Sequence, residues 1–154
     1  SASAKFLLNS RGIRLPGLVA RCAEGKIKSP GDLAAVVRCA ENRIGEPGSV
    51  VFDRNLFLEE GGFDESLRYY PDLDMWLRLL LCRDGFYTRK ALVGFRVHSS
   101  SLTGPNQQLA YSEWLRIYGK YSGLVGLSFP APWWLCARNL MVGTLRGWVI
   151  RALG

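Results

Sequence analysis

The feature that most constrains this fold is a pair of adjacent glycines followed by a proline that leads into a short helix. Gly61 and Gly62 allow positive φ angles and a close approach of the backbone to another group. Further along, Pro71 precedes Asp72, which stands where a helix N-cap is expected. The helix is expected to end at Asp84-Gly85. Its apolar face is predicted to hold Met75, Trp76, Leu79 and Leu80.

Two carboxylates stand at the start of this predicted helix, Asp72 at its N-cap and Asp74 in its first turn. The positive end of the helix dipole favours their ionised form, and an ionised carboxylate beside a glycine-lined cleft is suited to general base catalysis. The alternative is structural, with a helix cap and an ion pair between Asp74 and Arg78, four residues apart. Side chains at i and i+2 point about 200° apart on a helix, so we expect only one of the two acids to be functional.

Composition describes one folded domain with an uneven charge distribution. The chain has 154 residues, 48% hydrophobic content and a net charge of +7. Residues 1–45 carry eight Lys and Arg against three acids, and residues 124–154 carry three Arg and no acid. Basic ends indicate an anionic partner, which by charge alone is a phosphate-bearing ligand, a lipid surface or a nucleic acid.

The four cysteines form no C-x-x-C pair, which argues against a zinc site or a dense disulfide framework. We expect Cys39 and Cys82 to be buried as small apolar residues, in a reducing compartment. No signal peptide and no run of eighteen uncharged apolar residues is visible in the sequence.

The segments before the central helix predict three elements. A helix is predicted from 29 to about 41, a strand over 49–52, and a brief helix over 53–60. Asp53 is expected to cap the brief helix, and Gly61 to close it in αL geometry. The inner face of the first helix is predicted to hold Leu33, Val36, Val37 and Ala40.

Beyond the central helix, a strand is predicted over 87–98, with Val93, Phe95 and Val97 on one face and Gly94, Arg96 and His98 on the other. The only histidine therefore stands beside an arginine, before a polar loop of a kind that carries binding sites. His98 could be a metal ligand, a phosphate contact or a structural residue. Arg96 opposes metal binding unless an anion lies between the two side chains.

Two helices complete the prediction. One covers 106–121, with Ala110, Trp114, Ile117, Tyr118 and Tyr121 inward. The second covers 131–152, with a stripe of Trp134, Ala137, Met141, Leu145, Trp148 and Ala152. The opposite side of that helix holds Asn139, Gly143, Arg146, Gly147 and Arg151. Our first interpretation packs the stripe on the sheet, and the alternative lays it on a membrane surface, with the arginines meeting anionic lipid.

Four segments follow one another along the chain: Ile44–Phe52, Gly61–Glu65, Pro71–Arg78 and Phe95–His98. Together they resemble the C-terminal half of a family 2 glycosyltransferase of GT-A type, over about residues 40–103. The resemblance implies an α/β chain with a partial GT-A-like fold, a short mixed sheet flanked by helices, and a helical C-terminal extension. The expected boundary separates 1–103, the C-terminal part of the catalytic domain, from 104–154, the extension.

The resemblance also implies roles for residues. Asp72 matches the family's catalytic base, Pro71 replaces the Glu that often precedes it, and His98 matches a position that in some members binds a diphosphate-bound metal. The expected reaction is inverting sugar transfer from a nucleotide-sugar donor to an acceptor hydroxyl, a hexosyltransferase activity of polysaccharide biosynthesis, with Mg or Mn in the complete enzyme. The residues expected to line the substrate cleft or support the base are Gly61, Gly62, Phe63, Asp74, Trp76, Arg78 and Arg96.

The family's nucleotide-binding half is not found in this chain, so we expect a fragment that neither binds a nucleotide sugar tightly nor turns over alone. The expected acceptor is a glycan or a lipid-linked glycan, with no nucleic acid. The expected location is cytoplasmic, with peripheral contact to the inner face of a membrane through 131–152. Two alternatives stay open: a non-catalytic basic module that binds an anionic membrane or nucleic acid, and a pseudo-enzyme domain that has lost its donor site.

Overall fold

The structure, a computed structural model, describes residues 1–9, 11–16, 22–27, 30–39, 42–96, 107–128 and 130–153. The side chains of residues 107, 143 and 146–153 are not described. Within these ranges the chain is a mixed α/β protein with one three-stranded sheet and five α-helices. The predicted α/β class and mixed sheet are therefore confirmed, whereas the likeness to a GT-A fold stays a prediction.

The sheet has the strand order β1-β3-β2, with β3 (Gly85–Arg96) in the centre. β1 (Ala2–Leu8) runs parallel to β3, and the short β2 (Gly25–Ile27) runs antiparallel to it. The small residues at the start of β1 are buried, as is Lys5, so this strand shows no apolar–polar alternation. A strand without this alternation gives little periodic signal in the sequence.

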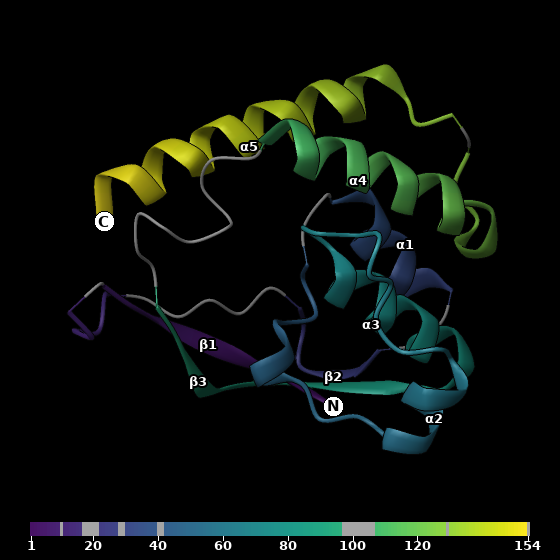
Figure 1. The fold of residues 1–154 in the computed structure, drawn as a ribbon, viewed down its shortest axis with the longest axis horizontal. Helices are drawn as coiled ribbons and strands as arrows, with labels where there is room; N and C mark the ends of the chain where they lie inside the picture. Colours follow the sequence, from purple (N-terminus) through teal and green to yellow (C-terminus); the bar gives the residue numbers. More distant parts are fainter. Residues whose placement is uncertain are drawn as a thin grey trace.

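Helices α1 (Gly31–Arg38) and α3 (Pro71–Cys82) lie between the sheet and the pair α4 (Gln107–Tyr121) and α5 (Trp133–Leu153), as Figure 1 shows. One hydrophobic core joins these layers, so residues on both sides of position 103 contribute to it. Its largest fully buried side chains are Trp76, Trp114, Tyr87, Tyr118 and Tyr121. The predicted inner faces of α1 and α4 are confirmed, except that Ala40 lies outside the described residues.

Helix α2 (Arg54–Glu59) begins and ends as predicted. The Asp53 carboxylate accepts hydrogen bonds from the N–H groups of Asn55 and Leu56, which have no partner within the helix. At the other end, Gly61 and Gly62 adopt φ angles of 81° and 71°. Their N–H groups donate to the carbonyls of Leu58 and Phe57, both at 3.0 Å, which is the Schellman pattern.

The predicted strand over 49–52 is wrong. Pro47–Ser49 form a 3₁₀ turn, η1, and Val50 makes only an isolated antiparallel bridge to Ala2. The Ser49 N–H and hydroxyl both donate to the Glu46 carbonyl, at 2.8 and 2.9 Å. Pro47 at the first position favours such a turn, and the local hydrogen bonds satisfy groups that a strand would need for pairing.

Asp72 is not the N-cap of the central helix. α3 begins at Pro71, and its N-cap is Tyr70, which offers no side-chain cap. A proline at the first helical position is favoured because its fixed φ suits the helix and its missing N–H needs no partner. Asp72 is therefore the second helical residue, and the helix ends at Cys82, close to the predicted Asp84-Gly85.

The predicted inner stripe of the C-terminal helix is also wrong. α5 buries Leu135 and Asn139, whereas Trp134, Met141 and Leu145 of the stripe are exposed. The helix packs on α4 and not on the sheet, because α1 and α3 cover the sheet face first. A pattern that is apolar on both sides cannot indicate which side a neighbour will cover.

Two further findings concern expectations from composition. Cys82, expected to be buried, is exposed at the end of α3, whereas Cys39 is half-buried.

Among the residues that the structure describes, none of the helices has the length and apolarity needed to cross a bilayer.

Candidate active site

Asp72 lies in the first turn of α3, half-buried, and both of its carboxylate oxygens accept hydrogen bonds. Asn42 Nδ2 donates to Oδ2 at 2.7 Å, and the N–H of Leu73 donates to Oδ1 at 2.7 Å. Each carboxylate oxygen has a second lone pair, so the carboxylate retains the capacity to accept a proton or a further hydrogen bond.

Asn42 is held in place by the turn that follows it. Its Nδ2 also donates to the Gly45 carbonyl at 2.7 Å, and its Oδ1 accepts from the Gly45 N–H at 3.0 Å. The Trp76 indole N–H donates to the same carbonyl at 2.8 Å, which ties α3 to this turn. Gly45 has φ 150°, and a Cβ there would lie 2.3 Å from Ser49 Oγ, so the position requires glycine.

The surroundings of Asp72 change its acidity. Burial raises the pKa of the carboxyl from its ordinary 3.8 to about 6, and the Glu46 carboxylate acts in the same direction. The hydrogen bonds from Leu73 and Asn42 oppose this shift because they stabilise the charged form. A carboxyl group with this pKa is largely ionised at neutral pH and is a stronger base than an exposed aspartate.

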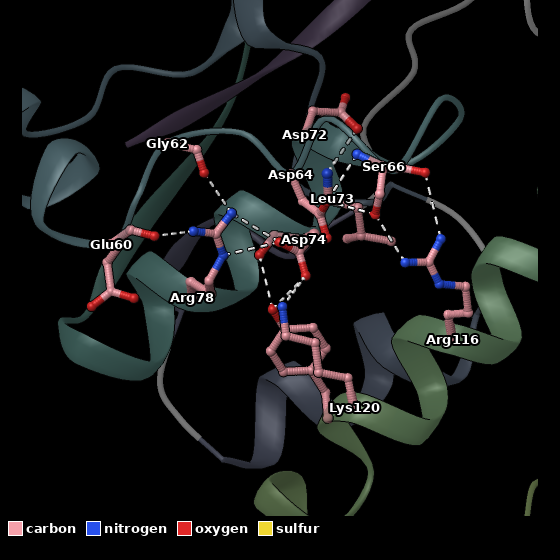
Figure 2. Close-up of polar contacts among 11 residues, drawn as sticks. Glu60, Gly62, Asp64, Ser66, Asp72, Leu73, Asp74, Arg78, Arg116 and Lys120 are labelled. Atoms are coloured by element: carbon pink, nitrogen blue, oxygen red, sulfur yellow. Dashed lines mark hydrogen bonds and ion pairs between the residues drawn. The ribbon is translucent and has the colours of Figure 1, made fainter.

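Asp74 points away from Asp72, into the contact between α3 and α4 (Figure 2). Its side chain is 1% exposed, and its Oδ2 accepts from Arg78 Nε at 2.9 Å, the predicted i,i+4 pair. Its Oδ1 accepts from Lys120 Nζ and from the Tyr121 hydroxyl, both at 2.7 Å. Burial, followed by the hydrogen bond to this carboxylate, raises the pKa of Tyr121. These contacts assign Asp74 to the support of the fold.

Arg78 connects this carboxylate to the glycine turn. Its NH2 donates to the Gly62 carbonyl at 2.6 Å, and its NH1 donates to the Glu60 carbonyl (Figure 2). Two carbonyls at the end of α2 thus accept hydrogen bonds from a guanidinium that Asp74 holds in position. The predicted glycine turn and the predicted helix are therefore joined through one arginine.

Phe63 follows the glycine turn and belongs to an aromatic cluster. Its ring lies 5.2 Å from that of Phe57 and 6.1 Å from that of Trp76, both edge to face. Phe52 completes the cluster, with its centroid 5.3 Å from that of Trp76. Phe63 keeps 38% of its surface exposed, so it presents an aromatic face beside the α2–α3 contact.

Glu113 on α4 organises the segment that leads to Asp72, and the sequence prediction missed it. Its carboxylate accepts hydrogen bonds from the N–H groups of Arg68, Tyr69 and Tyr70, at 2.8, 2.7 and 3.0 Å. It is 2% exposed. The signal was present in the sequence, because Glu113 stands at helical spacing between Ala110 and Ile117 on the predicted apolar face.

Asp64 lies in the loop before α3 (Figure 2). Its Oδ1 accepts from the Ser66 N–H at 2.9 Å and from the Ser66 hydroxyl at 2.7 Å. These hydrogen bonds lower the pKa of Asp64, with a smaller contribution from Arg116. Arg116 of α4 donates to Ser66 Oγ at 2.9 Å, so this turn is held by its own side chains and by α4.

A groove of about 350 Å³ lies against α3. Its lining includes the apolar side chains of Trp76, Leu79, Ile44 and Phe52 and the charged side chains of Asp53 and Arg83. The described residues that line it do not include Asp72. Trp76 of the groove is linked to Asp72 indirectly, because its indole N–H and Asn42 Nδ2 donate to the same Gly45 carbonyl.

The predicted metal site finds no support among the described residues. Arg96 is the last residue of β3, paired with Leu8, whereas His98 lies outside the described residues. Asp72 and Asp74 have separate partners, as their i,i+2 spacing predicted. Within the described ranges, no group of three or more His, Cys, Asp and Glu side chains is arranged to hold a metal ion. The expected divalent cation therefore stays a prediction.

The site thus has a half-buried, weakly acidic carboxyl group at the start of a helix, beside an asparagine that holds one of its oxygens. The second acid, the arginine and the glycine turn form a support connected to α4. Comparison of the chain with protein-family models, with curated proteins and with solved structures gives no match.

Proposed function

We propose that this chain is the acceptor-side portion of an inverting glycosyltransferase that resembles family 2, with Asp72 as the general base. The observation that carries the proposal is the Asp72 carboxyl, whose pKa burial raises to about 6 while Asn42 holds it in position. A carboxyl group with a pKa just below neutral is mostly ionised at pH 7 and still basic enough to take a proton from an acceptor hydroxyl during its attack. The four sequence segments that resemble the family provide the reaction class.

In the proposed reaction, an acceptor hydroxyl attacks the anomeric carbon of the donor sugar. A new bond forms between the acceptor oxygen and that carbon as the bond from the carbon to the diphosphate oxygen breaks. The hydroxyl proton passes to Asp72, and the nucleoside diphosphate leaves with the electron pair of the broken bond. Attack opposite the leaving group inverts the configuration of the anomeric carbon.

The other predicted site residues take supporting positions in this proposal. Asp74 and Arg78 fix the first turn of α3 against α4 and the glycine turn, which limits the orientations open to Asp72. Phe63 offers an exposed aromatic face, of a kind on which sugar rings stack. Residues that bind the nucleotide and its cation are expected outside this chain, and no step is assigned to a metal.

The test is sugar transfer measured with an expression unit that also contains the residues encoded upstream of Ser1. We expect Asp72→Asn to lower kcat by about 10²- to 10⁴-fold, the usual contribution of a general base, with KM changed far less. Asp84→Asn removes an exposed carboxylate just beyond the C-terminal end of α3 and should leave kcat unchanged. Retention of wild-type kcat by Asp72→Asn would exclude this residue as the base.

The 154-residue chain provides a second measurement. Incubated alone with radiolabelled nucleotide sugars and glycan acceptors, it is expected to transfer no sugar. Transfer by this chain alone would contradict the expectation that donor-binding residues lie elsewhere. A domain that has lost its donor site would instead bind acceptors and stay inactive in the longer unit as well.

A further inference from the structure

Helix α5 exposes a broad apolar face. Trp133 is 81% exposed, Met141 61% and Leu145 67%, and Trp134 and Leu140 are about half exposed. At 100° per residue these five side chains fall on one side of the helix, opposite the buried Leu135 and Asn139. Large apolar side chains gathered on one exposed face of a helix indicate an interaction surface.

This face is turned outward by specific contacts. Arg138 NH2 donates to the Arg38 carbonyl at 2.9 Å, and Asn139 Nδ2 donates to the same carbonyl at 3.4 Å. The buried Leu135 packs in the core, and α5 lies along α4 at the outer edge of the molecule (Figure 1). The helix is therefore fixed to the last turn of α1, and its apolar face points away from the domain.

The charge of this part of the chain indicates the partner. Residues 124–154 contain Arg138, Arg146 and Arg151 and no aspartate or glutamate. A tryptophan-rich helix face within such a purely cationic segment matches the surface of a bilayer. There the acyl chains are apolar and the headgroups above them can be anionic. Tryptophan rings prefer the headgroup level of a bilayer because they combine a large apolar area with one N–H donor.

We propose that the α5 face formed by Trp133, Trp134, Leu140, Met141 and Leu145 binds the surface of a membrane that contains anionic lipid. The helix lies in the plane of the interface and does not cross the bilayer. This proposal does not rest on the proposed sugar transfer, because it uses neither Asp72 nor its neighbours. A membrane surface would bring a lipid-linked molecule to the domain, whatever the domain does with it.

The test is binding of the full chain to vesicles of phosphatidylglycerol and phosphatidylcholine, measured by sedimentation. The test variant is Trp133→Gln with Met141→Gln. Glutamine removes the apolar area of both side chains and, as a good helix former, keeps the helix intact. We expect its partition coefficient to fall by about tenfold or more, from the apolar area lost at the interface. The matched control, Leu58→Gln with Leu92→Gln, removes two side chains that are 54% and 68% exposed elsewhere and should bind like wild type.

Tryptophan fluorescence gives an independent readout. Trp76 and Trp114 are buried in the core, so lipids brominated in their acyl chains should quench only tryptophans of α5. Quenching is expected with anionic vesicles, less with pure phosphatidylcholine, and less at high salt, which screens the charge contribution. The circular dichroism spectrum of each variant checks that the helix remains.

Three results would overturn the proposal. The first is an absence of binding to anionic vesicles, and the second is equal binding by the α5 variant and wild type. The third is self-association of the chain, seen by light scattering and lost in the α5 variant, without any vesicle binding. That third result would identify a second copy of this chain as the occupant of the face.

Discussion

Asn42 donates a 2.7 Å hydrogen bond to Oδ2 of Asp72 across thirty positions of the chain. The same side-chain amide donates to the Gly45 carbonyl, so a single residue joins the turn before η1 to the first turn of α3. This contact sets both the orientation of the Asp72 carboxylate and, in part, its acidity. It is the relationship on which the candidate site depends most directly.

Asn42→Ala should raise the pKa of Asp72 further above about 6, because it removes a hydrogen bond that favours the charged form. The measurement is a pH titration of the Asp72 carboxyl carbon by NMR. Asn55→Ala, in the first turn of α2, provides an unrelated asparagine for comparison. An unchanged or lower pKa in Asn42→Ala would show that the hydrogen bond contributes little in solution.

Asp72→Asn should make the chain more stable than wild type at neutral pH. The carboxyl has a pKa near 3.8 when unfolded and about 6 when folded. As pH rises from 4 to 6, the unfolded state therefore loses its proton first, and wild type loses stability relative to the variant. This loss in the free energy of unfolding is at most about 3 kcal/mol, from 1.36 kcal/mol per unit of pKa difference. Urea unfolding of both proteins at pH 4 and 7 measures this, and an identical difference at both pH values would contradict it.

Asp74→Asn should lower the free energy of unfolding by about 3 kcal/mol, because it leaves Arg78 and Lys120 facing a neutral group in the α3–α4 contact. Asp53→Asn is the matched control. It weakens a 3.5 Å surface ion pair with Arg83 while keeping a good N-cap, so a change below about 1 kcal/mol is expected. Equal effects of the two substitutions in urea unfolding would argue against a structural role for Asp74.

Glu113→Gln should destabilise the chain by about 2 kcal/mol, since one carbonyl oxygen replaces two charged acceptors for three N–H groups. The amides of Arg68, Tyr69 and Tyr70 should exchange faster with deuterium, while amides in the middle of β3 keep their protection. Glu65→Gln, an exposed change in the same loop, serves as the control. Unaltered exchange at residues 68–70 would show that other contacts hold this segment.

The local elements of this fold follow from local chemistry. Asp53 caps α2, Gly61 ends it in αL geometry, and Met75, Trp76 and Leu79 form a buried helix face, because caps, φ angles and periodicity act over a few residues. The divergence of Asp72 and Asp74 follows from helix geometry in the same way. What the resemblance implied about sugar transfer stays a prediction.

Only the tertiary structure decides which groups meet across the chain. It brings Asn42 to Asp72, Lys120 to Asp74 and Glu113 to the loop before α3, and each contact depends on elements far apart in sequence. It also selects the buried side of α5, which is apolar on both sides, by covering Leu135 and leaving Trp133 exposed. Helical periodicity shows which residues share a face of a helix. Which neighbour covers that face is decided by packing, because the free energy of burial is gained only when two surfaces come into contact.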